Sequence, residues 1–183
     1  FFILSCQNKA ESNRVESPIE DSIHTDTIIV EEIEEQAPAK SSMALYLEEQ
    51  GLVNIHTLDS TIHVDLKYAT TDNFTKEILY DDLTEAYLHR IAAQKLAKAQ
   101  QLLKEIDPDL SLLVYDAGRP MSVQKKMYKV VQNTPYREYV ADPSKTGMHN
   151  YGMAVDLTIC QSDGTALDMG TSFDFFGKAA GIN

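Results

Sequence analysis

The arrangement of this chain is set by a buried strand that runs directly into a tight loop and a helix: Leu113-Val114-Tyr115-Asp116-Ala117-Gly118-Arg119-Pro120. The almost continuous apolar run over residues 111–115 predicts a strand in the middle of a sheet. Pro120 favours the first position of a helix, because a backbone N–H has no helical partner there in any case. Functional side chains are often carried by such strand-to-loop junctions. We therefore expect a central strand, a loop that presents Arg119, and a helix over residues 121–131.

The segments on either side alternate between strand and helix patterns. Residues 61–68 alternate between polar and apolar side chains, which predicts a half-buried strand. Apolar residues recur every three or four positions over residues 84–106 and predict a long helix, which Asp107-Pro108 ends. We also expect a strand over residues 153–159 and a short helix over residues 43–50. This order predicts an α+β fold with a small, mainly antiparallel sheet packed against helices.

The charge of the chain is strongly negative and unevenly distributed. Its 183 residues include 28 acidic and 16 basic side chains, which give a net charge of -12. A general nucleic-acid binder needs a basic surface to neutralise phosphates, so we expect no nucleic-acid partner. Residues 7–44 contain nine acidic and three basic side chains and so supply -6, half of the total. This polar, aperiodic stretch predicts a flexible spacer.

The first six residues, Phe1-Phe2-Ile3-Leu4-Ser5-Cys6, have the pattern of the end of a bacterial lipoprotein signal peptide. On this interpretation Cys6 is acylated and anchors the protein to the membrane at the cell envelope, on the periplasmic or extracellular face. The alternative is an apolar end with an ordinary cysteine. The expected organisation is a signal-peptide end over 1–6, the spacer over 7–44 and a folded domain over 45–183.

The chain has two cysteines, which excludes a disulfide framework if Cys6 carries lipid. Cys160 ends an apolar strand pattern, so we expect a buried structural cysteine and no nucleophile there.

A candidate metal site is indicated by Gly147-Met148-His149-Asn150-Tyr151-Gly152-Met153-Ala154-Val155-Asp156. Asp156 lies in an apolar strand pattern, where an unpaired carboxylate is costly to bury. A zinc ion shared with His149 would compensate it, because imidazole and carboxylate are both normal zinc ligands. A straight strand would point side chains seven residues apart to opposite faces, so we expect a bend at Gly152. Spacing alone also permits a surface histidine and an aspartate satisfied by a neighbouring strand.

Arg119 is the second candidate for chemistry. An arginine at this junction could bind a carboxylate or stabilise the oxyanion of a tetrahedral intermediate. The alternative is a local ion pair with Asp116 within the turn. If Arg119 acts on the transition state, we expect it to matter greatly for turnover and less for folding.

Four motifs in order resemble the D-alanyl-D-alanine dipeptidases of the zinc peptidase family that also contains D,D-carboxypeptidases. The resemblance runs from about Val53 to Asn183. Its motifs are Val64-Asp65-Leu66-Lys67-Tyr68-Ala69-Thr70-Thr71-Asp72-Asn73-Phe74, Asp116-Ala117-Gly118-Arg119-Pro120 with Ser122-Val123-Gln124, the His149 to Asp156 core, and Met169-Gly170-Thr171-Ser172-Phe173-Asp174-Phe175.

The resemblance implies a zinc D,D-peptidase fold, Zn²⁺ as the cofactor, and His149 and Asp156 as two of its ligands. It also implies that Arg119 stabilises the transition state while metal-activated water hydrolyses the dipeptide D-Ala-D-Ala. The chain departs from the family at Gly147, where the family usually has Ser. None of the five histidines has a Glu three residues before it, so the Glu-x-x-His motif of the general base and third ligand is absent from these residues.

We therefore expect a C-terminally truncated enzyme that binds zinc weakly and is inactive as this piece, with Glu-x-x-His about 20–50 residues beyond Asn183. Two other functions remain open. One is a zinc D,D-carboxypeptidase or endopeptidase that acts on peptidoglycan stem peptides. The other is a non-catalytic envelope lipoprotein that keeps the fold.

Overall fold

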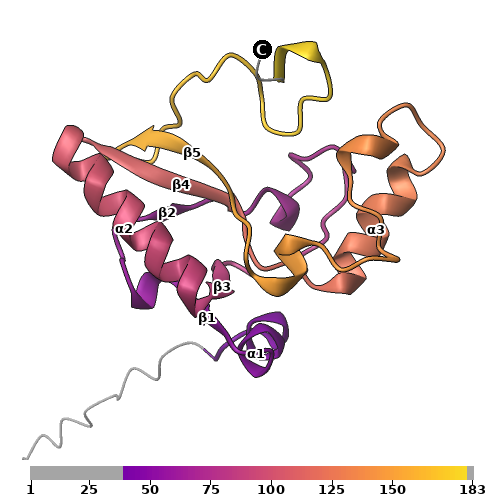
Figure 1. The fold of residues 1–183 in the computed structure, drawn as a ribbon, viewed down its shortest axis with the longest axis horizontal. Coiled ribbons are helices and arrows are strands. Elements are labelled where there is room, and N and C mark those ends of the chain that lie inside the picture. The colour runs from indigo at the N-terminus through magenta and orange to yellow at the C-terminus, as the bar shows by residue number, and fades with distance from the viewer. Residues whose placement is uncertain (1–38, 181–183) are drawn as a thin grey trace, which may run out of the picture. The chain divides into compact units, whose positions relative to one another are not determined.

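The computed structural model describes residues 39–180 (Figure 1). These residues belong to a compact unit over Pro38–Asn183. The expected signal-peptide end with Cys6, and the spacer up to residue 38, lie outside the described residues, so both stay predictions. Within residues 39–180, no helix is long and apolar enough to cross a membrane.

The three α-helices of residues 39–180 are α1 over Ser42–Glu49, α2 over Arg90–Ile106 and α3 over Met121–Val131. The side chain of Ser41 caps α1 by accepting a hydrogen bond from the backbone N–H of Ala44. Helix α2 buries a stripe at Ala93, Leu96, Ala97 and Gln100, as an amphipathic helix should. The predicted bounds of α3 are confirmed, with Pro120 directly before its first residue.

In the described part of the chain, five strands form two small sheets. Strand β1 over Leu52–Asn54 pairs antiparallel with β3 over Tyr87–His89. In the second sheet β4 over Leu110–Asp116 lies between β2 over His63–Val64, which is parallel to it, and β5 over Asp156–Gln161, which is antiparallel. The fold class is thus α+β, with two of three strand pairings antiparallel. The central place of β4 is confirmed.

Three boundaries predicted from the sequence were wrong, and one of them is the strand predicted over residues 153–159, which forms over Asp156–Gln161. The expected strand over residues 61–68 is reduced to His63–Val64, because the chain turns into a 3-10 helix at Lys67–Ala69. The amide of Asn73 stabilises this turn by donating to the backbone carbonyls of Lys67, Thr70 and Glu77. The long helix begins at Arg90 instead of residue 84, because the preceding residues pair with β1.

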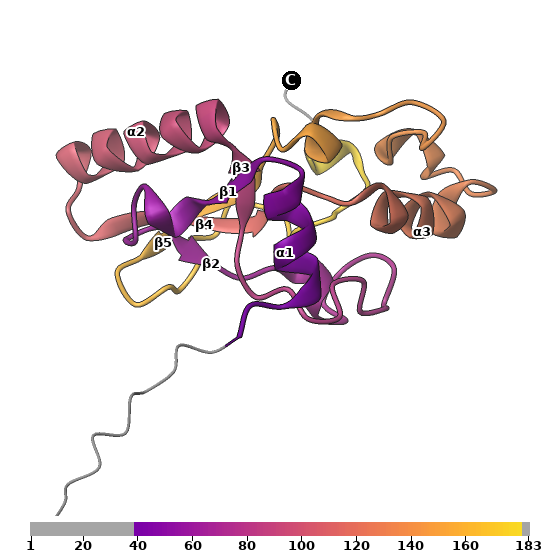
Figure 2. The same ribbon diagram turned by 90° about the horizontal axis from the view of Figure 1, so that it is seen from below.

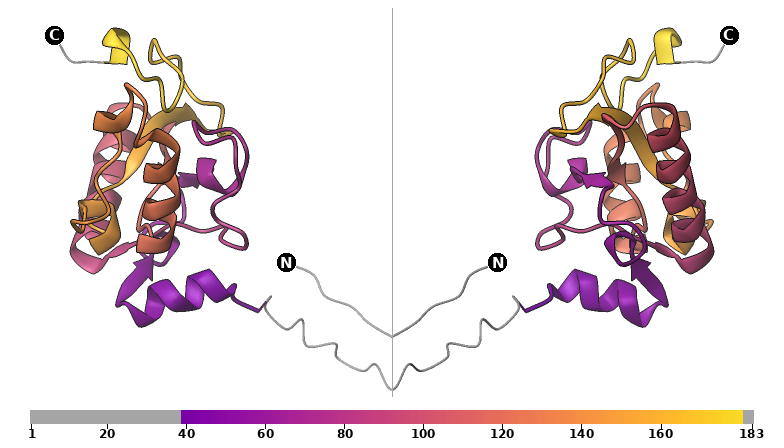
Figure 3. Two further views of the ribbon diagram at one scale, coloured as in Figure 1. Left: turned by 90° about the vertical axis from the view of Figure 1, so that its right-hand side faces the viewer. Right: turned by 90° about the vertical axis from the view of Figure 1, so that its left-hand side faces the viewer.

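Helix α2 runs along the β2–β4–β5 sheet and contacts β4, whereas α3 lies beyond the end of β4 (Figures 1 and 2). Helix α1 lies at the opposite end of this unit from residues 170–180 (Figure 3). One hydrophobic cluster joins these elements, with Val114 of β4 fully buried in it. Cys160 is likewise fully buried in β5, as expected. The loops at the Asp116 end of β4 therefore rest on a packed scaffold.

Candidate metal centre

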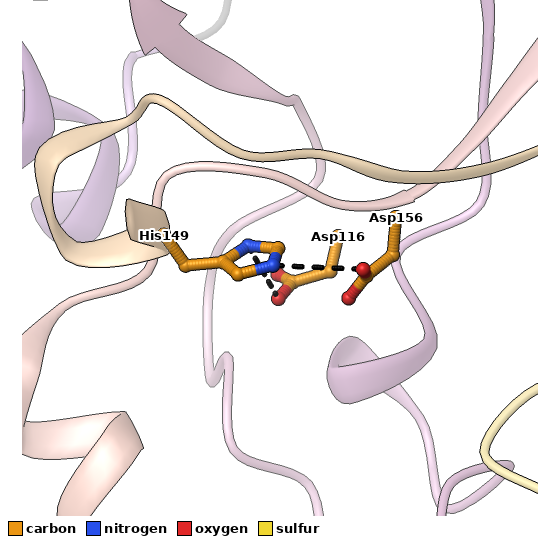
Figure 4. A group of neighbouring side chains, drawn as sticks. All are labelled: Asp116, His149 and Asp156. Carbon is orange, nitrogen blue, oxygen red and sulfur yellow. Dashed lines mark ion pairs between the residues drawn. The ribbon is translucent and has the colours of Figure 1, made fainter. Parts of the chain in front are cut away.

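Three side chains that can bind a metal ion converge at the end of the second sheet (Figure 4). They are Asp116, His149 and Asp156, and one potential ligand atom of each lies within 4.8 Å of the others. His149 and Asp156 are the two ligands predicted from the sequence. For Asp116 the sequence suggested only a turn pair with Arg119, but the structure also places it beside the histidine.

The two aspartates meet because they occupy paired positions on neighbouring strands. Asp116 is the last residue of β4, Asp156 is the first residue of β5, and the two are register partners. The register shifts between Val114 and Asp116, so Tyr115 is an extra residue opposite the β5 strand. Such a bulge re-aims the side chains that follow it, and bulges are common next to active sites. The bulge brings both carboxylates to one edge of the site.

His149 reaches the same place from a 3-10 turn over Met148–Tyr151. Gly152 ends this turn with a φ of 63°, a left-handed conformation that glycine adopts readily. A Cβ atom at Gly152 would lie 2.7 Å from the backbone N of His89 and 2.7 Å from Cδ2 of Leu52, so no side chain fits there. The expected bend at Gly152 is confirmed, and β5 starts only at Asp156.

The two nitrogens of the His149 ring face different partners. Nδ1 lies 2.9 Å from the carbonyl oxygen of Ala117, which fits an Nδ1–H that donates to it. This bond would leave Nε2 as the ligand atom, the arrangement typical of metal-binding histidines. Nε2 lies 3.5 Å from Oδ1 of Asp156. Two donors that share one tetrahedral zinc at ordinary bond lengths are about 3.4 Å apart, so this pair fits a shared ion.

Asp116 is less suited to be a ligand, because its oxygen atoms are already used. Its Oδ1 accepts a hydrogen bond of 2.5 Å from the hydroxyl of Tyr80. Its Oδ2 accepts from Nε of Arg119 at 2.8 Å and also from NH2 of the same guanidinium. The carboxylate approaches His149 at Nδ1, at 3.5 Å, and not at the free Nε2. Asp116 therefore supports Arg119 and the histidine from behind.

Arg119 forms the local pair with Asp116 that the sequence left open as an alternative, and it also faces the metal pair. Its side chain is buried, its NH1 donates to Oε1 of Gln124 at 2.8 Å, and its NH2 lies 3.6 Å from Oδ2 of Asp156. The guanidinium carries five N–H donors, and Asp116 and Gln124 use three of them. Two donors remain for a ligand in the pocket.

The net pKa shifts of Arg119, His149 and Asp156 all favour the charged form of each side chain. Burial lowers the pKa of Arg119, but the neighbouring carboxylate of Asp116 more than offsets this and raises the pKa above its usual range. Burial also lowers the pKa of His149, yet contact with Asp156 gives a net rise. Burial raises the pKa of Asp156, but His149 and Arg119 together lower it by more than this, so the net shift is downward. The site therefore holds a permanent cation beside an ionised carboxylate.

A pocket of about 930 Å³ opens over these residues. Aromatic side chains form much of its wall, and Asp174 adds a carboxylate from the segment after β5. The hydroxyl of Tyr68 lies 3.1 Å and 3.2 Å from the two carboxylate oxygens of Asp174, and burial raises the pKa of this carboxyl to about 6. Asp174 belongs to one of the motifs of the sequence but was not among the predicted site residues.

The fold and the site together define an α+β domain with a pocket suited to metal-assisted hydrolysis. Residues 48–181 match the model of a protein family described as D-ala-D-ala dipeptidase. The chain is also 34% identical to the D-alanyl-D-alanine dipeptidase of Escherichia coli (strain K12) over 123 residues. This match covers 67% of the chain and 61% of that enzyme, so the chain spans about three fifths of the relative's length. The chain belongs to the D-Ala-D-Ala dipeptidase family of peptidases.

Proposed function

We propose that the protein is a zinc-dependent peptidase that hydrolyses the free dipeptide D-Ala-D-Ala. The observation that carries this proposal is the pocket in which the His149–Asp156 pair and the guanidinium of Arg119 lie side by side, with the carboxylate of Asp174 in the same pocket. Similarity to the E. coli enzyme, whose name states this dipeptide, supports the choice of substrate.

His149 and Asp156 would hold the zinc ion through Nε2 and a carboxylate oxygen. Bound zinc supplies an activated water and polarises the peptide carbonyl. Arg119 presents its two remaining N–H donors to the oxyanion that develops on that carbonyl oxygen, in a buried setting where such donors are most effective. The third ligand and the general base are not among residues 1–183 at the Glu-x-x-His spacing. We propose that this motif lies outside these residues in the full-length protein.

Asp174 gives the pocket a group that can recognise a free amino terminus. An ionised carboxylate on an aromatic wall attracts an ammonium group, and the hydroxyl of Tyr68 orients the carboxylate. A free dipeptide has this ammonium group next to the scissile bond, whereas the D-Ala-D-Ala end of a stem peptide has an amide there. The carboxylate therefore favours the dipeptidase over the carboxypeptidase or endopeptidase alternative.

The test compares three substrates with the full-length, zinc-loaded protein: D-Ala-D-Ala, N-acetyl-D-Ala-D-Ala, and a muropeptide that ends in D-Ala-D-Ala. We expect efficient release of D-Ala from the free dipeptide and at least about 100-fold lower kcat/KM for the two amides. Preference for the muropeptide would show a carboxypeptidase. Zinc binding without hydrolysis of any substrate would support the non-catalytic lipoprotein.

We further propose that the protein is anchored at the cell envelope by lipid on Cys6. A dipeptidase held there would meet dipeptide outside the cytoplasm. Labelled fatty acid should enter the full-length precursor but not the Cys6→Ala variant. Equal labelling of both would contradict the anchor.

A further inference from the structure

We propose that Gln124 is a positioning residue for the reaction: it holds the guanidinium of Arg119 in place and couples it to the pocket wall at Ala141. This inference rests on the proposed function for its effect on catalysis. Gln124 lies in α3, which contributes no metal ligand, and its side chain is almost fully buried, with 2% of its surface exposed.

Both ends of the Gln124 carboxamide are used. Oε1 accepts from NH1 of Arg119 at 2.8 Å, and Nε2 donates to the carbonyl oxygen of Ala141 at 2.7 Å. A guanidinium can only donate and a carbonyl can only accept, so the amide has one orientation that satisfies both partners. The side chain is therefore a fixed bridge between the arginine and the loop that contains Ala141.

The guanidinium needs this bridge because, apart from Gln124, its side-chain hydrogen bonds within the described residues all go to a single atom. Nε and NH2 of Arg119 both donate to Oδ2 of Asp116. A planar group that is held at one oxygen atom can pivot about it. The bond from NH1 to Gln124 adds a second fixed point on another nitrogen, and two points stop the pivot. The N–H donors left for the pocket then keep one direction, which transition-state stabilisation requires.

The second bond of Gln124 extends the same control to the pocket. Tyr139, Val140 and Ala141 also line the pocket. The carbonyl group of Ala141 is tied to α3 through Gln124. A shift of the loop at Ala141 would therefore be transmitted through Gln124 to Arg119, so that the arginine and the loop move together.

The decisive variant is Gln124→Met, which keeps the length of the side chain but removes both hydrogen bonds. Gln100→Met is the matched control. Gln100 is also a fully buried glutamine with two sets of bonds, to Thr61 and to the backbone N–H of Leu112, and it does not line the pocket. We expect kcat of the full-length, zinc-loaded enzyme to fall about tenfold or more in Gln124→Met, with a smaller change in KM. Gln100→Met should lower the melting temperature but leave kcat within about twofold of the wild type.

A spectroscopic measurement separates this inference from the proposed function. In protein labelled with ¹⁵N-arginine, the guanidinium signals of Arg119 can be assigned from their loss in Arg119→Lys. We expect faster proton exchange of these signals in Gln124→Met and wild-type exchange in Gln100→Met, whether or not the protein cleaves D-Ala-D-Ala. If Gln124→Met does not fold, Gln124→Asn, which is one methylene too short for both bonds, replaces it. Unchanged guanidinium exchange, or unchanged kcat in an active enzyme, would overturn the positioning role.

Discussion

The carboxylate of Asp116 binds the guanidinium of Arg119 through one oxygen atom, Oδ2, and the two side chains are buried at 0% and 8% exposure. Each charge is the principal partner of the other, and little of either side chain is exposed. Removal of Arg119 leaves the buried carboxylate of Asp116 without its main opposite charge, which is far more costly than loss of a surface ion pair. This relationship means that Arg119 contributes to folding as well as to the pocket.

Arg119→Ala should therefore affect both activity and stability. We expect kcat to fall by about two orders of magnitude or more, because a donor to the oxyanion is lost. We also expect a loss of about 3–5 kcal/mol of folding free energy, since Asp116 is left unpaired. From the sequence, Arg119 is expected to matter less for folding than for turnover; its burial against Asp116 adds a second expected effect, on stability. Arg119→Lys keeps a charge near Asp116 and should be more stable but still impaired in turnover.

Chemical denaturation and steady-state kinetics of the same preparations measure the two effects. Arg137→Ala is the control, because Arg137 pairs with Asp142 at the surface, where both side chains are well exposed. It should change stability by at most about 1 kcal/mol. An Arg119→Ala protein as stable as the wild type would show that the buried pair does not form.

Metal binding distinguishes the roles of the two aspartates. His149→Ala and Asp156→Ala should each abolish tight zinc binding by the full-length protein, measured by calorimetric titration. Asp116→Asn should weaken it by only about 10- to 100-fold, as expected for a group behind the ligands. His63→Ala, a change in β2 outside the three-residue group, should leave affinity unchanged. If Asp116→Asn removes binding as fully as Asp156→Ala does, Asp116 is itself a ligand.

The sequence predicted the parts of the fold that depend on local pattern. The apolar run of β4 and the helix that begins after Pro120 were placed correctly, because both signals lie within a few residues. The strand over residues 61–68 was overestimated, since the alternation continues past the point where Asn73 binds three carbonyl groups and turns the chain. The start of α2 was misplaced because β3 forms only by pairing with the distant β1.

The candidate site was predictable to a similar extent. Sequence motifs selected Arg119, His149 and Asp156, and the structure brings these three side chains together. Their catalytic roles stay predictions. The place of Asp116 beside His149 depends on the bulge at Tyr115, for which the sequence carries no clear signal. Asp174, which lines the pocket, has a left-handed φ of 58°. This backbone conformation is unusual outside glycine, and no local sequence pattern predicts it here.

The pH dependence of substrate binding follows from Asp174. Burial raises the pKa of this carboxyl from 3.8 to about 6, so it is largely neutral at pH 5 and ionised above pH 7. Only the ionised form attracts an ammonium group, and KM for D-Ala-D-Ala should therefore fall as pH rises through about 6. Asp174→Asn should have a high KM without this dependence, and Asn tolerates the left-handed backbone. Kinetics at pH 5 and 7.5 measure the difference.

The same pKa shift predicts an effect on stability. The folded protein binds the Asp174 proton more tightly than the unfolded chain does, so ionisation of this group disfavours the fold as pH rises from about 4 through 6. Asp174→Asn should thus gain melting temperature relative to the wild type at pH 7 but not at pH 4. Asp168→Asn, an exposed change in the same segment, should show neither effect. A pH-independent difference for Asp174→Asn would contradict the raised pKa.

Gly152 ends the turn that positions His149, so its replacement tests the geometry of the site without any assumption about the reaction. Gly152→Ala places a methyl group 2.7 Å from the backbone N of His89 and 2.7 Å from Leu52. The left-handed φ of 63° costs about 1–2 kcal/mol for a residue with a side chain, and the overpacking adds about 1–3 kcal/mol. A shift of residue 152 that relieves this contact is expected to displace His149 or Asp156 as well, because Gly152 lies between them in the chain.

Gly51→Ala supplies the matched control, because Gly51 also has a positive φ, 81°, but no atom lies within 4 Å of the added Cβ. The Gly51→Ala variant should lose only about 1–2 kcal/mol of folding free energy, the cost of the left-handed backbone, and keep wild-type zinc affinity. The difference between the two variants in denaturant titrations isolates the close approach of Gly152 to His89 and Leu52. Zinc affinity should fall in Gly152→Ala alone, because only there does the strained turn carry a metal ligand. Equal losses of stability in both variants, with zinc affinity intact, would show that the turn does not position His149.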